Sequence, residues 1–496
     1  MKRIIQQLDG WREAKAIVVG DFMLDRSVFG LADRLSPDAP VPVLHAQRET
    51  NNAGGAGNVC LCLRALRCAV SCVGLIGADD AGRTLGATLE EAGCSIEGLI
   101  VTADRPTTLK HSLVGLAQHR HPQKMFRIDY EDKSPIDERT AERVAEAVEA
   151  RLADADVLCL EDYNKGLLTP GLCRRLIESA SKAGVPVLVD PAAIDNYAKY
   201  RGATCITPNR SEAGLATGLP FGDGSRNEAV ARAIAEQHDI EVVVLTLDRE
   251  GALLLERGAE PVHVPTVARN VYDVTGAGDM VLAAMAAGRA NLWSWGDATA
   301  LANLAAGLEV EQFGVVPIQL DEVLLAALQR VHDSSKVRKI DDLVVELNAH
   351  RRRGKKIAFT NGCFDILHTG HVELLRGARA QGDLLVLAVN SDASIHALKG
   401  PDRPINGEAD RLDMLNELQS VDYLVLFGDG AGGEADTPKP LLRALQPDVL
   451  VKGGQYEHHE VVGWEIVEAY GGKVVTIPHV DGRSTTDIVN RIRAGG

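Results

Sequence analysis

The stretch DVTGAGD occupies residues 273–279 and is followed directly by the helix-forming sequence MVLAAMAAGRA. Small glycines in front of a helix leave backbone N–H groups free, and the amino-terminal end of the helix adds positive potential. The stretch therefore predicts an anion-binding loop. Its last residue, Asp279, is either a helix cap or a base that takes the proton of a hydroxyl attacking a phosphate.

Outward from this loop, short apolar runs alternate with helical patterns along most of the chain. The runs typical of buried strands lie at 16–20, 157–161, 186–190 and 241–247, and two clear helical patterns lie at 138–153 and 171–184. Strands that are apolar throughout indicate parallel sheets covered by helices. The expected fold class is therefore α/β.

The alternation stops once, at HDSSKVRK (332–339), which is polar and has no apolar period. A helix at 340–352 and the strand IAFT (357–360) then restart it. This indicates a linker at 332–339 between a domain at 1–331 and a domain at 340–496. A chain of 496 residues is expected to form two or three domains.

The composition is 45% hydrophobic and 25% charged, which is typical of a globular protein. The formal net charge of -16 argues against sequence-independent binding to nucleic acid or to an anionic membrane. We find neither a signal peptide nor a membrane span, so we expect a cytoplasmic protein. The nine cysteines lack the paired spacing of a zinc site and are interpreted as small buried side chains in a reducing compartment.

Polar residues follow several of the predicted strands. Asp21 and Asp25 in GDFMLD follow the first strand, where carboxylates suit the hydroxyls of a sugar. Asn209 and Glu212 in TPNRSE are three residues apart and could hold a metal-bound triphosphate through water. The stretch TLDREGALLLE (246–256) predicts a strand–turn–strand of the kind that lines an adenine pocket.

Two further groups leave their role open. Asp162 and Lys165 in EDYNKG lie just past a strand end and either face the same cleft or form a local ion pair on a solvated turn. The segment after residue 105 is expected to supply a lid. Its basic residues Lys124 and Arg127 either bind a second phosphate on the sugar or lie on a solvated edge.

GGAGNV (54–59) followed by DVTGAGD, in this order and spacing, resembles the ribokinase-like (phosphofructokinase B) carbohydrate kinases over residues 15–317. The resemblance implies a ribokinase-like domain with a parallel central sheet and a small β lid, and it implies Asp279 as the catalytic base. It also implies an anion hole, a site for ATP with Mg²⁺ near Glu212 but without assigned protein ligands, and contacts to the sugar. The residues implied are Gly276, Ala277 and Gly278 for the anion hole, Asn209, Arg210, Ser211 and Glu212 for ATP, and Asp25, Gly55 and Asn58 for the sugar.

The second half contains NGCFDILHTGHVELL (361–375), in which His368 and His371 are three residues apart. A metal site would need a third ligand that the sequence does not offer nearby, and a nucleophile would need an activating partner. The remaining interpretation is electrostatic, because two imidazoles and backbone amides at a strand–helix junction can neutralise charge on a transferring phosphate. Lys452, at the end of another predicted strand, agrees with this.

GCFDILHTGH together with DGRSTTDI resembles the H-x-G-H nucleotidyltransferases of the cytidylyltransferase-like superfamily over residues 354–492. The resemblance implies a Rossmann-like domain in which His368 and His371 stabilise the transition state at the α-phosphate while pyrophosphate leaves. It also implies a set of residues that hold the other phosphates of ATP. These are Lys399, Arg403, Ser484, Thr485 and Thr486.

RLSPDAPVPVL (34–44), PDVLVKGG (447–454) and STTDIVNRI (484–492) extend the match, and the whole chain resembles the bifunctional enzymes of ADP-heptose synthesis in Gram-negative bacteria. The resemblance implies phosphorylation of D-glycero-β-D-manno-heptose 7-phosphate at O1, and then transfer of AMP from ATP to the 1-phosphate for the lipopolysaccharide core. The alternative is another sugar phosphate, with CTP as a possible nucleotide. A homodimer through the first domain is expected. The glycine-rich loop at 427–438 departs from the family pattern.

Overall fold

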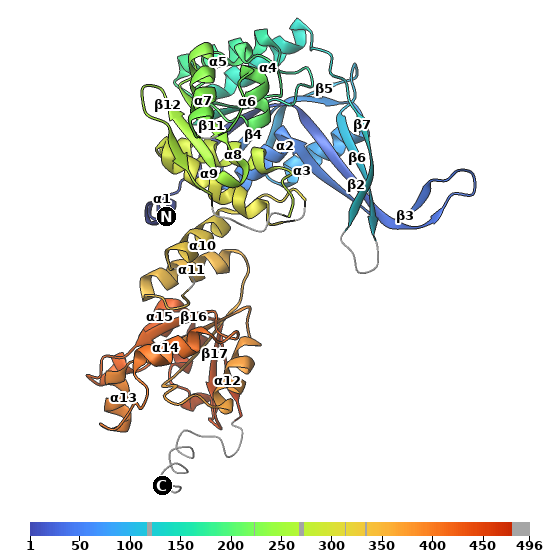
Figure 1. Ribbon diagram of the computed structural model, residues 1–496. Coiled ribbons are helices and arrows are strands. Elements are labelled where there is room, and N and C mark those ends of the chain that lie inside the picture. Colours follow the sequence, from blue (N-terminus) through green and yellow to red (C-terminus); the bar gives the residue numbers. More distant parts are fainter. Residues whose placement is uncertain (117–121, 223, 267–271, 313, 333–334, 479–496) are drawn as a thin grey trace. The chain divides into compact units, whose positions relative to one another are not determined.

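The computed structural model describes six stretches of the chain and separates it into two compact units (Figure 1). One unit is Arg3–Val323, and the other begins at Leu324 and also includes Met1 and Lys2. None of the helices in the described part of the chain combines the length and the apolar character that a bilayer span needs. The described residues are 1–116, 122–222, 224–266, 272–312, 314–332 and 335–478.

The N-terminal unit is built on a long, mostly parallel sheet. Its described strands, in spatial order, are β13 (Val262–Val264), β12 (Ala252–Glu256), β11 (Val242–Thr246), β10 (Cys205–Ile206), β9 (Val187–Asp190), β8 (Val157–Glu161), β1 (Lys15–Gly20), β4 (Ala69–Gly77) and β5 (Ser95–Thr102). β12 is antiparallel to both β11 and β13, and the other neighbours are parallel. Every residue of β8 is buried, which explains its uninterrupted apolar run.

Helices cover both faces of this sheet (Figure 1). Ile17 and Val19 of β1 share a buried cluster with side chains of α4, α5, α6 and α7, while α8 packs against both α2 and α9. The described helices of this unit are α2 (Ala56–Ala65), α3 (Asp80–Glu91), α4 (Glu138–Leu152), α5 (Pro170–Ala183), α6 (Arg210–Thr217), α7 (Gly224–His238), α8 (Ala277–Ala290) and α9 (Trp295–Glu309). Two more helices cross its boundaries, α1 (Lys2–Asp9) and α10 (Leu320–Val331).

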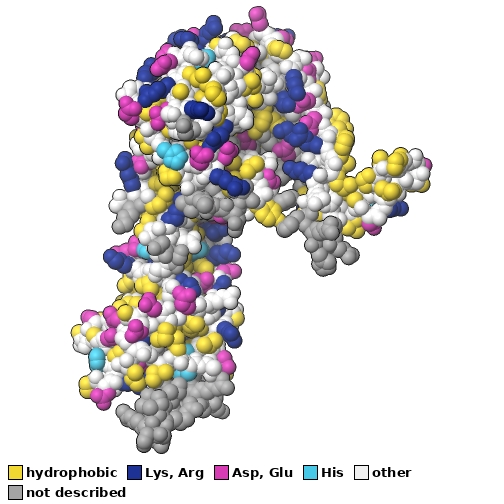
Figure 2. Space-filling view, in the orientation of Figure 1, with side chains coloured by type: hydrophobic (Ala, Val, Ile, Leu, Met, Phe, Trp, Pro, Cys, Tyr) yellow, Lys and Arg dark blue, Asp and Glu magenta, His cyan; other side chains and the backbone are white. Residues whose placement is uncertain are grey.

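A second sheet of the same unit forms the predicted β lid. Its described strands lie in the order β3 (Pro42–Gly55), β2 (Phe22–Leu35), β6 (Thr108–Leu116) and β7 (Gln123–Tyr130). Asp25 of β2 lies opposite both Asn52 and Lys110, so the three side chains share one face of the lid. Hydrophobic side chains gather along the projecting β2–β3 hairpin (Figure 2), and Leu35 and Val41 are exposed there.

The C-terminal unit contains a parallel sheet, β16 (Tyr423–Phe427), β15 (Leu384–Asn390), β14 (Ile357–Gly362), β17 (Val449–Gly453) and β18 (Lys473–Ile477), in this spatial order. All its strand pairs are parallel, and a separate buried cluster lies on each face. The sheet is Rossmann-like, and the α/β fold class is confirmed. The helices are α11 (Ile340–Arg352), α12 (Thr369–Arg379), α13 (Asp392–Lys399), α14 (Glu408–Asn416), α15 (Lys439–Leu445) and α16 (Trp464–Ala469).

Part of the predicted linker 332–339 is bonded into this second unit. Leu424 of β16 donates its amide to the carbonyl of Lys336 over 2.9 Å and accepts the amide of Arg338 over 2.8 Å. The guanidinium of Arg338 is paired with Glu346 of α11, and both residues are buried. Residues 336–338 therefore act as an edge extension of the sheet, which a polar sequence without apolar period does not reveal.

A fragment of residues 340–496 should consequently be less stable than a fragment of residues 332–496. The shorter fragment leaves Glu346 buried without Arg338, a loss that costs ~3–5 kcal/mol when a buried pair is broken. Urea denaturation of both fragments measures the difference. The Arg338→Met variant of the longer fragment should lose most of the same stability, and equal stability of all three would contradict this role.

Candidate active sites

Asp279 lies in the first turn of α8, three residues after Gly276, and the backbone at Gly276 requires a glycine. Gly276 adopts a φ of 92°, and a Cβ at this position would come within 2.7 Å of Oε1 of Glu309. Oδ2 of Asp279 accepts a hydrogen bond from Nδ2 of Asn58 over 2.6 Å, and Oδ1 accepts one from the hydroxyl of Tyr163 over 3.0 Å. The carboxylate is thus held at the helix start by side chains from other segments and does not cap that helix.

Burial raises the pKa of the Asp279 carboxyl from 3.8 to about 6, although the hydrogen bonds from Asn58 and Tyr163 and the nearby charge of Lys110 oppose this. Burial and the charge of Asp279 likewise raise the pKa of Glu309 to about 8. The start of α8 therefore has beside it one carboxyl that is ionised at neutral pH, Asp279, and one that is mostly protonated, Glu309.

If Asp279 is the base of the kinase reaction, the rate should follow its ionisation. We expect kcat/KM for the sugar to rise about tenfold per pH unit below pH ~6 and to be flat above it, because the protonated carboxyl cannot accept the proton. Initial rates of ADP formation between pH 4.5 and 8, with circular dichroism at each pH, measure this. A value of kcat/KM that stays flat down to pH 4.5, as expected for a base with the ordinary pKa of 3.8, would contradict the burial of the base.

Two carboxylates that the sequence analysis did not single out lie beside Asp279. Glu161 ends β8 and Asp190 ends β9, and one oxygen from each of the three acids lies within 4.8 Å of the others. Oε2 of Glu161 is buried without a hydrogen-bond partner. Oxygen donors of this kind are the ligands that Mg²⁺ prefers, so the donor set fits a hard divalent cation. Their only sequence signal is an acid at the end of an apolar strand.

The residues predicted to contact sugar are divided between the main sheet and the lid. Oδ2 of Asp21 accepts the amides of Tyr163 and Lys165 over 2.9 and 3.0 Å, and burial raises the pKa of Asp21 to about 6. Asp25 lies on the lid beside Lys110, and burial raises its pKa. Gly55 has a φ of 55°, and a Cβ at this position would lie 2.5 Å from the carbonyl oxygen of Asp21, so only glycine fits here.

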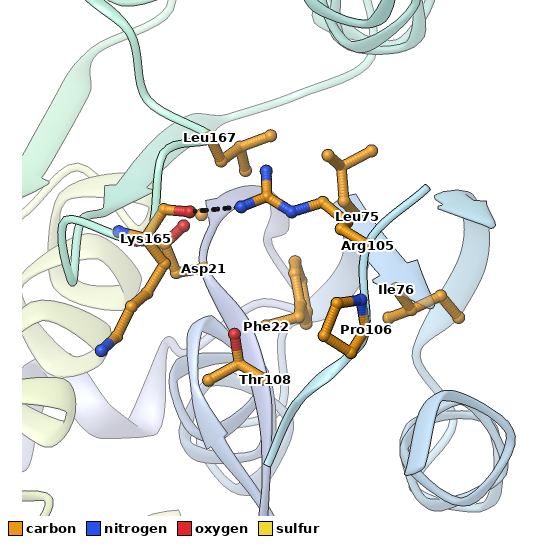
Figure 3. Close-up of a pocket in the computed structure, with 10 residues that line it drawn as sticks. Asp21, Phe22, Leu75, Ile76, Arg105, Pro106, Thr108, Lys165 and Leu167 are labelled. Carbon is orange, nitrogen blue, oxygen red and sulfur yellow. Dashed lines mark hydrogen bonds between the residues drawn. The ribbon is translucent and has the colours of Figure 1, made fainter. Parts of the chain in front are cut away.

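Asp162 and Lys165 are both engaged with other side chains. The buried carboxylate of Asp162 is paired with Lys199 and accepts the hydroxyl of Tyr200 over 2.8 Å. The ammonium of Lys165 is paired with Glu131. Figure 3 shows Lys165 and Asp21 at a recess of about 30 Å³, where the carbonyl of Lys165 accepts a hydrogen bond from Arg105 over 3.0 Å. The recess has room for one water molecule and not for a sugar.

The basic lid residues differ in their contacts. Arg127 forms a two-bond ion pair with Asp129 of the same strand, both bonds being 2.8 Å long. Lys124 is exposed, and its charge, like that of Lys110, lowers the pKa of Asp25 against the larger effect of burial. Lys110 is closer to the centre of the site, since its ammonium lies 5.1 Å from the centre of the Tyr163 ring.

Asn209 and Glu212 form a reciprocal cap at the start of α6. The side chain of Asn209 accepts the amide of Glu212 over 3.0 Å, and Glu212 accepts the amide of Asn209 over 2.9 Å. Burial raises the pKa of Glu212, which also lies close enough to raise that of Asp190. Arg210 pairs with Glu250 over 2.6 Å, and Ser211 is exposed. β11 and β12 confirm the predicted strand–turn–strand at 246–256.

In the C-terminal unit, the two histidines lie where the sequence predicts them, at the junction of β14 and α12. His368 immediately precedes α12, and His371 lies in its first turn. Their rings stack with centres 3.9 Å apart, and the centre of the Phe364 ring lies 4.9 Å from the centre of the His371 ring. Lys452, at the carboxyl end of β17, is half-buried, and this burial lowers its pKa. Imidazoles and a lysine thus gather at the carboxyl edge of the sheet.

The loop that carries Arg403 is tied to the histidine motif. Arg403 is paired with the buried Asp365, which also accepts the amides of Ile405 and Asn406 over 2.7 and 3.1 Å. Despite burial, these bonds lower the pKa of Asp365. Lys399 is exposed at the end of α13. Three predicted phosphate-binding residues, Ser484, Thr485 and Thr486, lie outside the described residues.

Arg411 is a supporting residue that no sequence motif indicated. It is fully buried, and its guanidinium donates to the carbonyls of Cys363 and Asn406 over 2.6 and 3.1 Å and to Asp392 over 2.7 Å. It therefore joins the histidine motif to the Arg403 loop. The glycine-rich loop at 427–438 is closed by Asp436, which accepts two backbone amides of that loop.

Family models match both units. A model described as pfkB family carbohydrate kinase matches residues 13–321, and a cytidylyltransferase-like model matches residues 359–491. A protein from Pelobacter propionicus named Bifunctional protein HldE is 43% identical over 482 residues, which are 97% of this chain and 96% of that protein. The chain belongs to the HldE family. Another HldE, from Caulobacter sp. (strain K31), is 44% identical over 485 residues, 97% of this chain and 96% of its own.

Membership of the HldE family confirms the predicted resemblance over the full length. The chain is a bifunctional transferase, a carbohydrate kinase followed by a nucleotidyltransferase. Escherichia coli phosphofructokinase-2 matches 62% of this chain and 97% of its own at a TM-score of 0.52 and 16% identity. Arabidopsis thaliana ribokinase matches 64% of this chain and 99% of its own at 0.50 and 21%. These two likenesses establish the ribokinase-like fold of the first unit.

Proposed function

We propose that the first domain phosphorylates D-glycero-β-D-manno-heptose 7-phosphate at O1 with ATP, and that the second transfers AMP from ATP to the resulting 1-phosphate. The products are ADP-heptose and pyrophosphate, and the 7-phosphate is removed between the steps. The observation that carries this proposal is the buried Asp279 carboxylate beside the glycine-led start of α8, in a different unit from the stacked His368 and His371.

In the kinase half, the amides of Gly278 and Asp279 would hold the γ-phosphate, since they open a helix with its positive end toward the anion. The amide of Ala277 would join them on leaving its 3.4 Å bond to the carbonyl of Val274. Asp279 accepts the proton of O1 as O1 attacks phosphorus in line with the leaving ADP. Asp25 and Asn52 would contact the hydroxyls of the sugar from the lid. Lys110, near Tyr163 and Asp25, is a better-placed partner for a sugar phosphate than Arg127, whose guanidinium is already paired.

In the nucleotidyltransferase half, a phosphate oxygen of the sugar 1-phosphate attacks the α-phosphorus of ATP, and pyrophosphate leaves. His368 and His371 would donate hydrogen bonds to the charge that develops on the α-phosphate. Lys452 lies at the same edge and suits another phosphate oxygen. Asp365 and Arg411 position the motif through their bonds to the neighbouring loop.

Magnesium is proposed as the cation of both steps, and Glu161, Asp190 and Asp279 are its candidate neighbours in the kinase half. It would bridge phosphate oxygens of ATP and reduce their charge. Each step should therefore stop on addition of EDTA and resume with Mg²⁺. Stoichiometric zinc in protein purified without added metal, with loss of adenylyl transfer on its removal, would contradict this.

We further propose a cytoplasmic homodimer, with domains at 1–331 and 340–496. The exposed Leu35, Val41 and Phe126 of the lid support a contact between two copies, because exposed apolar side chains of this size gather at interfaces. Light scattering of the full chain and of a Leu35→Asp variant measures the mass of each.

Incubation with ATP and a panel of sugar phosphates, followed by mass analysis, tests the substrate. A new sugar bisphosphate from the heptose 7-phosphate alone would support the proposal. Preference for another sugar phosphate, or for CTP in the second step, would favour the alternative of a related kinase–nucleotidyltransferase.

A further inference from the structure

Tyr163 contacts the proposed base of the kinase reaction directly. Its hydroxyl donates to Oδ1 of Asp279 over 3.0 Å, while Asn58 donates to the other oxygen. Asp279 is 4% exposed, whereas Tyr163 is 39% exposed. The hydroxyl of Tyr163 therefore occupies Oδ1 of Asp279, and Tyr163, as the more exposed residue of this pair, is the one that a substrate can reach.

The backbone of Tyr163 is fixed, but its side chain is held lightly. Its amide donates to Asp21 over 2.9 Å, and the preceding Asp162 is anchored by Lys199 and Tyr200. The side chain is bonded to Asp279, has the Lys110 ammonium near its ring, and lies close to the backbone of Gly55. A change of rotamer therefore breaks one hydrogen bond without moving the loop.

The position of this hydroxyl matters because the reacting sugar hydroxyl must donate its proton to the same carboxylate. A water molecule in that place would be activated in the same way and would hydrolyse ATP. The Tyr163 hydroxyl donates its hydrogen to Asp279, so it occupies the position of the reacting hydroxyl as a hydrogen-bond donor. It fills the position without acting as a phosphoryl acceptor.

We propose that Tyr163 selects the phosphoryl acceptor: without sugar its hydroxyl occupies the proton-accepting side of Asp279 and keeps water away, and the reacting hydroxyl of the sugar displaces it. This inference rests on the proposed kinase function and on Asp279 as its base. It makes Tyr163 a residue that distinguishes sugar from water.

The test is ADP formation by the full chain with and without heptose 7-phosphate. ADP is measured because the second half releases pyrophosphate instead. Tyr163→Phe should raise sugar-independent ADP formation by ~10-fold or more, the range of one hydrogen bond to a charged group, while turnover at saturating sugar stays within about threefold of wild type. Tyr163→Leu should raise it further. Tyr456→Phe, which changes a tyrosine that is 45% exposed in the other unit, should leave it unchanged.

The pH dependence of kcat/KM and of kcat shows whether the sugar displaces the Tyr163 hydroxyl from Asp279 or leaves it bonded there. The Tyr163 bond lowers the pKa of Asp279, so Tyr163→Phe should move the acidic limb to higher pH. Because kcat/KM reports the free enzyme and kcat the complex with substrate, a displaced hydroxyl shifts the limb of kcat/KM alone. A permanent bond shifts both.

Unchanged sugar-independent ADP formation in Tyr163→Phe and Tyr163→Leu, with a shift in both limbs, would overturn the inference and leave Tyr163 as a positioning residue. The kinase function would stand in that case, provided that wild type phosphorylates the sugar and Asp279→Asn does not. Failure of wild type to phosphorylate it, or full activity of Asp279→Asn, would instead remove the proposed function and this inference with it.

Discussion

Asp279→Asn should lower kinase turnover by ~10²–10⁴ or more, because the amide cannot take the proton of the attacking hydroxyl. Asparagine has nearly the same size; its carbonyl oxygen can still accept the hydrogen bond from Asn58, and its NH2 group can donate to the hydroxyl oxygen of Tyr163. The folded structure should therefore persist. ADP formation with the heptose 7-phosphate under saturating ATP measures the loss.

The same variant should adenylylate supplied heptose 1-phosphate at the wild-type rate, since Asp279 belongs to the other unit. Glu309→Gln is a matched control, because it also replaces a buried carboxyl near the loop and Glu309 is mostly protonated at neutral pH. It should change kinase turnover far less. Loss of both half-reactions in folded Asp279→Asn would require one shared nucleotide site.

His371→Ala should have the reverse effect and lower adenylyl transfer by ~10²–10³, which is the usual cost of removing one donor aimed at a developing charge. The ring of His371 stacks on His368 and touches Phe364, so its removal leaves a gap at the start of α12. Pyrophosphate release with heptose 1-phosphate measures the effect.

His371→Gln separates the two contributions, because glutamine can still donate a hydrogen bond but does not stack. Partial activity of His371→Gln would support the role as donor. A kinase rate unchanged in both variants is expected from their separate units. Wild-type adenylyl transfer by folded His371→Ala would show that the histidine pair does not stabilise the transition state.

Much of the regular structure was predictable from periodicity. The apolar run at 157–161 is β8, the pattern at 138–153 is α4 to within one residue, and the helix expected at 340–352 is α11. The strand β8 is buried at every residue and the two helices bury one face, and both arrangements leave a clear pattern in the sequence. The long hairpin of β2 and β3 was not predicted, because its strands carry polar side chains on both faces and few of them are buried.

The candidate sites were predictable where a motif surrounds the residue. Asp279, His368 and His371 lie at helix starts marked by glycine, and such starts are readable from short strings. Glu161, Asp190 and Arg411 were not predictable, because they meet their partners only through the sheet and through loops distant in sequence. The ion-pair partners of Asp162 and Lys165 were not predictable for the same reason, because Lys199 and Glu131 are distant from them in sequence.

The central claim is that one chain carries two independent sites for consecutive steps. Its most direct test is ADP-heptose formation from the 7-phosphate sugar, ATP and a phosphatase by Asp279→Asn and His371→Ala, each alone and mixed. The account predicts little product from either variant alone and restored product from the mixture, because the 1-phosphate made by His371→Ala diffuses to Asp279→Asn. A mixture as inactive as its two folded components would contradict it.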